Sequence, residues 1–382
     1  MKKAFKHLPT IVFLLFIYTI SILFIALPKK DYSAHEKRYL ADFPTFTVES
    51  FFSSDFGKDF ETALCDHTPF RNFFVGLNSY YNLSLGNPLS NGIYHCKDGY
   101  LLNDPAKADR LDINFQIISD FAKESDVNTT MLLAPSTGYV CSDVLPNKHI
   151  KYNDDENFEK AKETLKDGGV TFVDVRETLK NAYSDGTQVF YKTDHHWTTD
   201  GAYLSYCELA KSLGFEANSK EDYEIESYDG FYGTTYSSSG YWLTKPDTVQ
   251  VYKSKDIKDI SVSITEGKNT IESDSMFFLT HVDADDKYPI FLDGNHPYTV
   301  IKNNSIDKEK DNGKLLILKD SFAHSLTPFL ADHYREIVMV DMRYYRQSIK
   351  ELLNEGDFDQ MLFLYSIDNL STDTDLAQIS IK

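Results

Sequence analysis

Cysteine is scarce in this sequence, and the four residues present are widely spaced. None belongs to a Cys-x-x-Cys pair, so the chain has neither a zinc-ribbon pattern nor the dense disulfide framework of a small secreted domain. A single bridge between Cys65 and Cys96 stays open as an alternative. Stability must come mainly from an apolar core, which 382 residues with 42% hydrophobic content can supply.

Positive charge is in deficit as well. The chain has 58 acidic residues against 39 Lys and Arg residues, a formal net charge of −19. Such a chain repels the phosphate backbone of nucleic acids, and no basic stripe offsets this repulsion. We therefore expect no nucleic-acid partner. Aromatic residues are abundant, at 14%, and these rings either stack on sugars or fill the core.

Long apolar runs are absent from this sequence, with one exception near its start. That run covers residues 11–27 and contains no charged residue. It reaches the shorter end of the length that crosses a bilayer, and it is too long and bulky for a typical signal-peptide core. We expect an uncleaved transmembrane signal anchor at residues 10–28, with a cleaved signal peptide as the alternative. Lysines flank the run on both sides: Lys2, Lys3, Lys6, Lys29 and Lys30.

The orientation of this anchor follows from its short N-terminal tail. Residues 1–9 carry three of the lysines and the α-amino group, which favours a cytoplasmic tail. The remainder of the chain would then lie outside the cytoplasm, held to the cell membrane by a single pass.

The part that follows the anchor divides into two patterns. Residues 29–105 read as a polar lead-in or cap segment, with apolar residues at helical spacing up to Pro69 and a hairpin at residues 92–102. Residues 106–382 read as α/β, interrupted at about 218–300 by short alternating runs that predict a β-rich insertion. The expected helices lie near residues 109–125, 155–166, 199–213, 322–334 and 345–353. The expected strands lie at residues 129–134, 170–175, 187–191, 314–318, 336–340 and 360–364.

Strands that alternate with helices predict a mostly parallel sheet flanked by helices and joined by right-handed crossovers. Sites in such sheets form where strands end and helices begin. Ser321 occupies such a junction, because it follows the apolar run 315–318 and opens a helix. Free N–H groups of a first helical turn can stabilise an oxyanion, and a serine with a positioned base becomes a nucleophile. The alternative is an ordinary N-cap serine.

A second junction carries Asp194 and His196. The two residues are separated by one position, and on an extended segment such side chains point the same way. The Asp194 carboxylate could therefore orient the His196 imidazole, as in a serine triad. Trp197 would then buttress the loop. Two alternatives are a solvated polar loop and a zinc site, since Asp and His are ligand types that zinc accepts. Neighbouring side chains project in different directions and no spaced ligand pair completes a metal site, so we expect no metal and no cofactor.

The run Lys192-Thr193-Asp194-His195-His196-Trp197-Thr198-Thr199-Asp200-Gly201-Ala202 resembles the signature of the DHHW protein family. That family is related to alginate acetylation proteins of the AlgJ/AlgX type, whose SGNH-hydrolase-like domain carries an Asp-x-His-Trp motif. The resemblance covers roughly residues 35–375. Further blocks that carry it are Glu36-Lys37-Arg38 with Phe43-Pro44, Asp66-His67 with Phe70-Arg71, Asn91-Gly92, Gly294-Asn295-His296-Pro297 and Leu318-Lys319-Asp320-Ser321-Phe322.

This resemblance implies an SGNH-hydrolase-like fold in which Ser321 is the nucleophile, His196 the base and Asp194 its orienter. Lys319 departs from the Gly-Asp-Ser of ordinary SGNH hydrolases, which puts one oxyanion contact in doubt. Arg343 falls where related acetylation proteins place an active-site arginine, and a structural ion pair with Asp341 or Glu336 is the equal alternative. The remaining candidates for substrate or oxyanion contacts are His195, Trp197, Asn295 and Tyr139, and Asn369 lies at the same sheet edge.

The leading functional hypothesis is an O-acetyltransferase that modifies a cell-surface polysaccharide or similar envelope glycan through an acyl-enzyme. Its partners would be the glycan acceptor, the membrane and a membrane-bound O-acyltransferase that supplies the acyl group. The resemblance to related systems implies this last partner. The first rival is a carbohydrate acetylesterase on the same fold, because water and a sugar hydroxyl attack the same acyl-enzyme. The second is a non-catalytic glycan-binding or assembly protein.

Overall fold

The computed structural model describes residues 2–33, 35–53, 55–307 and 309–380. The chain forms two compact units, and the first of them is discontinuous in sequence. One unit comprises Met1–Asn91 together with Tyr236–Leu243, and the other comprises Gly92–Thr235 and Thr244–Lys382. The chain therefore leaves the larger unit after Thr235 and returns to it at Thr244.

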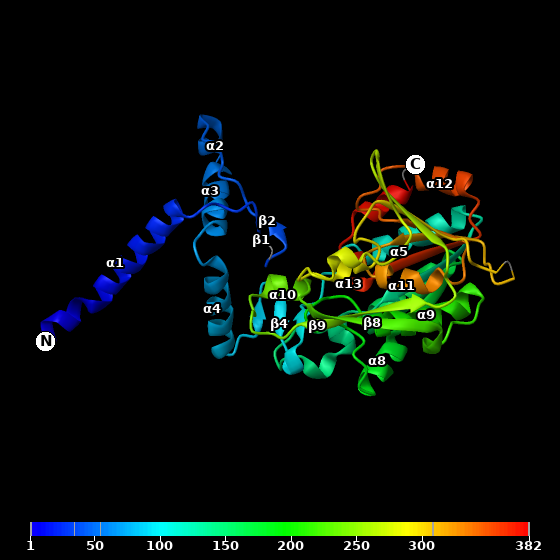
Figure 1. Ribbon diagram of the computed structural model, residues 1–382, viewed down its shortest axis with the longest axis horizontal. Helices are drawn as coiled ribbons and strands as arrows, with labels where there is room; N and C mark the ends of the chain where they lie inside the picture. The colour runs from blue at the N-terminus through cyan, green and yellow to red at the C-terminus, as the bar shows by residue number, and fades with distance from the viewer. Residues whose placement is uncertain (1, 34, 54, 308, 381–382) are drawn as a thin grey trace. The chain divides into compact units, whose positions relative to one another are not determined.

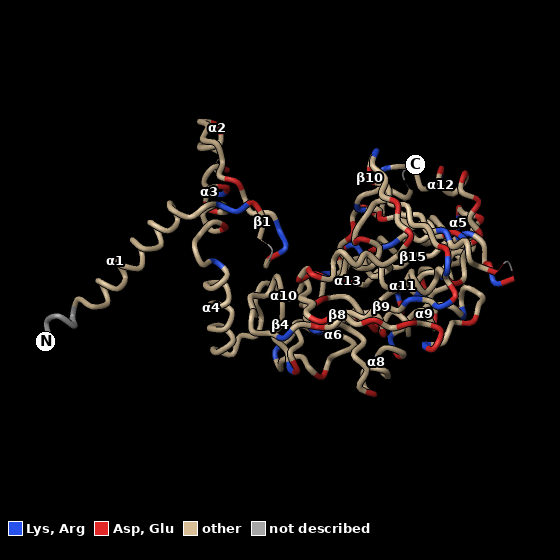
Figure 2. The backbone as a smooth tube through the Cα atoms, viewed as in Figure 1, with Lys and Arg blue, Asp and Glu red and all other residues tan. Residues whose placement is uncertain are grey.

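The smaller unit is mainly helical (Figure 1). Its first helix, α1 (Lys2–Ala26), carries no Lys, Arg, Asp or Glu from His7 onward, and this part of its tube is tan in Figure 2. The stretch His7–Ala26, with a mean hydropathy of 2.5, is long and apolar enough to cross a membrane by length and composition, a test that a signal sequence also meets. The other elements of this unit are β1 (Tyr32–Ser33), β2 (Arg38–Tyr39), α2 (Val48–Phe52), α3 (Asp55–Asp66), α4 (Arg71–Ser84) and β3 (Leu89–Ser90).

The larger unit is built on an eight-stranded sheet with the strand order β11-β10-β12-β14-β13-β15-β6-β7. Strands β14, β13, β15, β6 and β7 run parallel, as the alternating pattern predicted, and the other three join the sheet through antiparallel pairs. The parallel strands are β6 (Asn128–Ala134), β7 (Thr171–Asp174), β13 (Lys314–Lys319), β14 (Glu336–Val340) and β15 (Gln360–Ser366). The antiparallel strands are β10 (Ile260–Glu266), β11 (Asn269–Ser273) and β12 (Tyr298–Asn303).

Helices cover both faces of this sheet, which is why residues 315–318 of the central strand β13 are all apolar. Leu316 and Leu318 share a core with residues of α5 (Leu111–Glu124) and α7 (Asp154–Asp167), whereas Leu315 and Ile317 alternate to the other face and are equally buried. The other larger helices are α8 (Arg176–Ser184), α9 (Thr199–Leu213), α11 (Ala323–Leu330) and α12 (Ile349–Gly356). Helix α9 packs on α11 and against β6 and β7.

One expectation about the strands was wrong. Residues 187–191 form no strand, because Val189 and Tyr191 exchange backbone hydrogen bonds with Thr198 and His196 in a tight local loop. The β-rich segment expected at about 218–300 is present. Its strands β10–β12 extend the main sheet through antiparallel pairing of β12 with β14, while β8 (Tyr223–Phe231) and β9 (Asp247–Ser254) form their own ladder.

The cysteines are all free thiols, so the bridge considered between Cys65 and Cys96 does not form. Cys96 and Cys141 are buried, and Cys65 is exposed. Burial raises the pKa of Cys96 to about 12, so this thiol stays protonated. The hairpin expected near residue 97 is present as β4 (Ile93–His95) and β5 (Leu101–Asn103).

The buried imidazole of His333, in the larger unit, predicts that acid lowers the stability of the fold. His333 accepts a hydrogen bond from Tyr206 (2.7 Å) and stacks on Phe215 (3.9 Å between centroids), and burial lowers its pKa from 6.5 to about 4. Between these two values the unfolded chain binds more protons than the folded chain, so stability falls as the pH falls through this window. The loss attributable to His333 is about 3 kcal/mol between pH 7 and pH 4.

His333→Phe keeps a ring on Phe215 and removes the titration. We expect urea denaturation of this variant to show a flatter dependence of the free energy of unfolding on pH between 7 and 4 than the parent shows. An unchanged slope would contradict the assignment.

Candidate active site

The loop that carries Asp194 is fixed by its neighbours on both sides. The Asp247 carboxylate accepts hydrogen bonds from the backbone N–H groups of Lys192 (3.1 Å) and Thr193 (2.8 Å) and from the Thr193 hydroxyl (2.7 Å). Gly233 packs so closely that a Cβ there would lie 2.1 Å from the Asp194 Cβ. The loop is therefore held before any substrate arrives.

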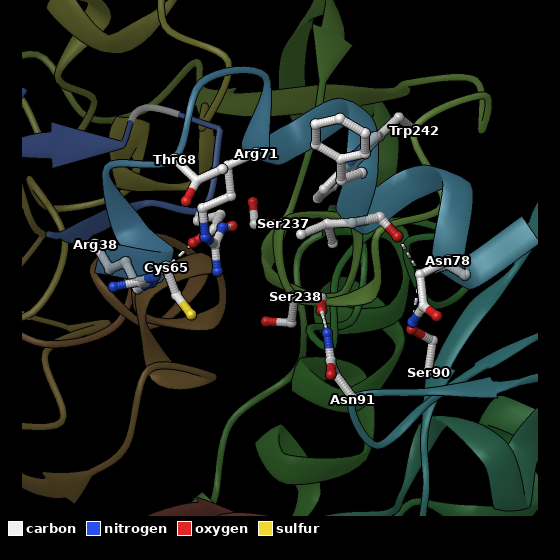
Figure 3. Close-up of a pocket in the computed structure, with 14 residues that line it drawn as sticks. Arg38, Cys65, Thr68, Arg71, Asn78, Ser90, Asn91, Ser237, Ser238 and Trp242 are labelled. Carbon is white, nitrogen blue, oxygen red and sulfur yellow. Dashed lines mark hydrogen bonds and ion pairs between the residues drawn. The ribbon is translucent and has the colours of Figure 1, made fainter. Parts of the chain in front are cut away.

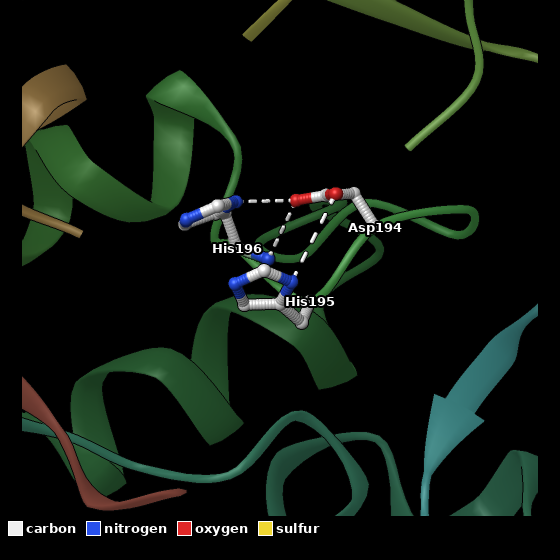
Figure 4. A group of neighbouring side chains, drawn as sticks. All are labelled: Asp194, His195 and His196. Carbon is white, nitrogen blue, oxygen red and sulfur yellow. Dashed lines mark hydrogen bonds and ion pairs between the residues drawn. The ribbon is translucent and has the colours of Figure 1, made fainter. Parts of the chain in front are cut away.

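Asp194, His196 and Ser321 form one continuous chain of hydrogen bonds. His196 Nδ1 lies 2.5 Å from Asp194 Oδ1, and His196 Nε2 lies 2.7 Å from Ser321 Oγ. Figure 4 shows the carboxylate facing the imidazole of His196. Since the carboxylate accepts, Nδ1 carries the proton and Nε2 is left to accept from the serine hydroxyl. This is the tautomer that a general base needs.

The segment between Asp194 and His196 is a bend, not the extended strand that we expected. Asp194 Oδ1 also accepts the backbone N–H of His196 at 3.0 Å, so the carboxylate closes a short turn of the kind that Asp favours. The two side chains meet, as the two-residue spacing indicated. They do so because the turn folds one over the other.

Asp194 is held as a carboxylate despite its burial. Thr234 donates to its second oxygen from the backbone N–H (2.7 Å) and from the hydroxyl (2.9 Å). Burial raises the pKa of Asp194, but the imidazoles of His196 and His195 and these donors outweigh burial and hold it well below its ordinary value. A carboxylate that stays charged next to His196 stabilises the imidazolium that proton transfer creates.

Ser321 lies between β13 and α11, at the carboxyl end of the central strand. Helix α11 begins only at Ala323, so Ser321 is not its N-cap, and its hydroxyl is aimed at His196. The preceding Asp320 anchors the turn by accepting from the backbone N–H groups of Phe322 (2.9 Å) and Ser366 (2.7 Å). Asn369, which was expected at this edge of the sheet, also donates to Asp320 (3.0 Å) and thereby supports the turn.

Tyr288 is a site residue that the sequence did not indicate. Its ring stacks on His196 at 3.8 Å between centroids with an interplanar angle of 9°, and its hydroxyl donates to the carbonyl of Ser321 (2.9 Å). One side chain therefore orients both the base and the nucleophile. Burial raises the pKa of Tyr288 well above its ordinary value, so the hydroxyl keeps its proton. No local motif marks Tyr288, which comes from the β-rich segment.

The two other residues of the motif have separate environments. The His195 ring lies 3.9 Å from that of His196, tilted by 35°, and its Nδ1 bonds Thr234 Oγ1 (2.6 Å). It keeps 30% of its side chain exposed, so it can line a cleft. Burial and the neighbouring His196 lower its pKa to about 4. Trp197 is fully buried, and its indole N–H donates to the Phe322 carbonyl (3.1 Å) and Ser325 Oγ (2.9 Å). It buttresses the loop and offers no surface to a substrate, contrary to its place among the contact candidates.

Arg343 is paired with Asp341 by two hydrogen bonds, at 2.8 and 2.6 Å, and also donates to Asn295 Oδ1 (3.1 Å). The structure thus shows the ion-pair alternative for Arg343, with 29% of its side chain still exposed. Lys319 stands where ordinary SGNH hydrolases have glycine. Its ammonium donates to the same carboxylate, that of Asp341, at 3.1 Å. Burial lowers the pKa of Lys319, and Asp341 opposes that shift.

Tyr139 lies outside this group. Its hydroxyl donates to Asp155, and the Lys180 ammonium covers its ring at 3.5 Å. The short helix α6 (Thr137–Val140) contributes a different residue to the site, because the Thr137 hydroxyl donates to the His195 carbonyl (3.3 Å). Sequence position placed Tyr139 at the right edge of the sheet, but the turn of the helix points it away.

Asp194, His195 and His196 also offer three possible metal ligands within 4.8 Å of one another. A metal would have to compete for atoms that are already bonded, since both ring nitrogens of His196 have partners in Asp194 and Ser321. The hydrogen-bond pattern fits a proton-transfer chain better than a coordination site.

Comparisons with known proteins agree with this fold. Residues 169–340 match the family model of the DHHW protein, and residues 100–237 match that of the SGNH hydrolase-like domain of acetyltransferase AlgX. No curated protein matches the chain.

Two solved structures are similar over nearly their whole length. A DHHW family protein from Eubacterium siraeum is 21% identical with a TM-score of 0.64, and the match covers 76% of this chain and 96% of that one. Bacillus cereus PatB1 with a sulfonyl adduct is 24% identical with a TM-score of 0.64, and the match covers 75% of this chain and 98% of that one. The chain thus has an SGNH hydrolase-like fold, and its resemblance to the DHHW and AlgX-type proteins is confirmed.

Proposed function

We propose that this protein is a membrane-anchored, extracytoplasmic O-acyltransferase that moves an acetyl group onto a hydroxyl of a cell-surface polysaccharide or envelope glycan. The observation that carries the proposal is the unbroken hydrogen-bond chain from Asp194 through His196 to Ser321. The match to an acetyltransferase family model supports the reaction class. The apolar helix His7–Ala26 supports the anchor.

In the first half-reaction Ser321 Oγ attacks the carbonyl carbon of the donor ester, and its proton passes to His196 Nε2. The bond between the acyl carbon and the leaving oxygen breaks, and the imidazolium protonates that oxygen. Asp194 stabilises the imidazolium throughout. Atoms balance, with acetyl-Ser321 and the free donor alcohol as products.

In the second half-reaction a sugar hydroxyl gives its proton to His196 and attacks acetyl-Ser321, which releases the acetylated glycan and regenerates the serine. Ser321 is 6% exposed, so its hydroxyl is largely enclosed by the protein. Because acetyl-CoA is cytoplasmic, a membrane-bound O-acyltransferase would supply the acetyl donor. That partner is part of the proposal.

The test uses the full chain in detergent with p-nitrophenyl acetate as donor and oligosaccharides as acceptors. We expect p-nitrophenol release, an acetyl group on Ser321 in the quenched protein and acetylated acceptor by mass spectrometry. Release of acetate with unmodified acceptors would indicate that the protein is an esterase and not a transferase. Failure of both p-nitrophenol release and Ser321 acetylation would favour a non-catalytic glycan-binding role.

A further inference from the structure

The smaller unit contains a cavity of about 620 Å³ (Figure 3). This volume lies within the range of small-ligand sites. Its wall combines one partly exposed indole, Trp242, with hydroxyl and amide side chains that include Thr68, Asn78, Ser90 and Ser238. All of its lining residues belong to this unit, so the cavity is independent of the triad.

The wall that carries Trp242 is firmly built. The indole N–H donates to the Asn72 carbonyl (2.8 Å), and the ring packs edge-on against His35 (4.1 Å between centroids). Gly76 on α4 is required there, because a Cβ would lie 2.6 Å from the indole. Gly240, at φ +78°, lets the chain turn against Ser79. The aromatic ring is therefore held in place before a ligand binds.

Two further hydrogen bonds hold the segment Tyr236–Leu243 in place. Asn91 donates from Nδ2 to the Ser238 carbonyl (3.0 Å), and Ser79 Oγ donates to the Ser239 carbonyl (3.1 Å). The segment Tyr236–Leu243 is thereby tied to residues far away in the sequence. Such pre-formed walls lower the entropic cost of binding.

The two arginines of the cavity wall are neutralised by Glu36 of the wall and by Asp66, which is not one of the lining residues. Arg38 binds both oxygens of Asp66 (2.8 and 2.5 Å) and donates to Glu36 (2.8 Å), and Arg71 pairs with Glu36. The hydrogen bond from Arg38 lowers the pKa of Asp66, so that carboxyl stays charged. Two guanidinium groups face two carboxylates, which leaves no uncompensated charge to attract an anion.

We infer that this cavity binds an uncharged oligosaccharide, with a sugar ring stacked on Trp242 and its hydroxyl groups bonded to the hydroxyl and amide side chains of the wall. A flat aromatic ring among neutral hydrogen-bonding groups suits the apolar face and the hydroxyl edge of a pyranose. The inference goes beyond the proposed function, because binding here requires no chemistry at Ser321.

Two lining residues, Cys65 and Trp242, can report on the binding of a ligand in the cavity. Cys65 lines it and is exposed, whereas Cys96 and Cys141 are buried. Of the two tryptophans in the chain, Trp197 is fully buried in the other unit, so a ligand-induced fluorescence change reports on Trp242. Both signals can be followed in the full chain in detergent.

The probes are cellohexaose, laminarihexaose and mannohexaose, with an oligogalacturonate hexamer as the charged counterpart. We expect at least one neutral hexasaccharide to slow alkylation of Cys65 by iodoacetamide, read by peptide mass spectrometry with Cys207 as reference, and to change tryptophan fluorescence saturably. Trp242→Ala should weaken the affinity roughly tenfold, and Trp242→Phe less. Ser238→Tyr, at an exposed position, should block the cavity without disturbing the fold.

Two outcomes would overturn the inference. One is the absence of any effect of the saccharides on Cys65 alkylation and fluorescence. The other is protection by the oligogalacturonate alone, which would assign the cavity to its arginines. Failure of the proposed function gives a different pattern: Ser321→Ala should bind the hexasaccharide normally, and Trp242→Ala should hydrolyse p-nitrophenyl acetate normally.

Discussion

Ser321→Ala should lower the turnover of p-nitrophenyl acetate by about 10⁴- to 10⁶-fold. The alanine has no oxygen to form the acyl-enzyme, and the hydrogen bond from Ser321 Oγ to His196 Nε2 (2.7 Å) is lost with it. Initial rates of p-nitrophenol release measure the effect. In the parent, a sulfonyl fluoride should modify one residue, Ser321, and should leave the variant unmodified.

A matched control separates chemistry from packing. Ser205 is fully buried in α9, and its hydroxyl bonds only the Gly201 carbonyl of its own helix (2.9 Å). Ser205→Ala should therefore keep full turnover. If Ser321→Ala retained more than about a tenth of the parental rate, the serine would not be the nucleophile, and the acyl-enzyme route would fail.

Asp194→Asn should lower kcat by about 10⁴-fold, because a carboxamide cannot stabilise the imidazolium and favours the wrong tautomer of His196. The side chain keeps its size, so Gly233 and the donors of Thr234 still have a group to pack against. The measurement is the pH profile of kcat on p-nitrophenyl acetate. The lower kcat of the variant should be seen across the whole profile.

Asp332→Asn provides the matched control for a buried carboxyl. Asp332 accepts hydrogen bonds from Tyr223 (3.1 Å) and Ser254 (2.5 Å), and burial raises its pKa to about 6. Its replacement should change thermal stability and leave the pH profile of kcat intact. Equal losses of kcat in the two variants would mean that Asp194 acts through folding alone.

The parts of the fold that could be predicted are those in which local pattern and tertiary environment agree. Residues 315–318 are apolar at every position because helices cover both faces of the sheet, and β13 forms there as expected. Val189, Phe190 and Tyr191 are also buried and apolar but belong to a loop, because burial alone does not require a strand. The antiparallel extension of the sheet depends on the pairing of β12 with β14, which no spacing in the sequence specifies.

The site shows the same division. Asp194 and His196 were identifiable from their two-residue spacing and the DHHW signature, and Ser321 from its place between an apolar strand and a helix. Tyr288 and Thr234 were not, because a stacked ring and a donated hydrogen bond arise from tertiary packing and leave no pattern in the chain. The link between Ser321 and the motif 125 residues earlier rested on family resemblance before the geometry joined them.

The excursion of the chain into the smaller unit bears on how such a protein can evolve. Tyr236–Leu243 forms one wall around α4, although the codons for these two parts are far apart in the gene. A recombination event that exchanged only the beginning of the gene would deliver a new α4 to an old Tyr236–Leu243, with Gly76 and Trp242 no longer matched. The N-terminal region is thus not a segment that can be replaced independently, and its inheritance is coupled to a short stretch in the middle of the α/β sequence.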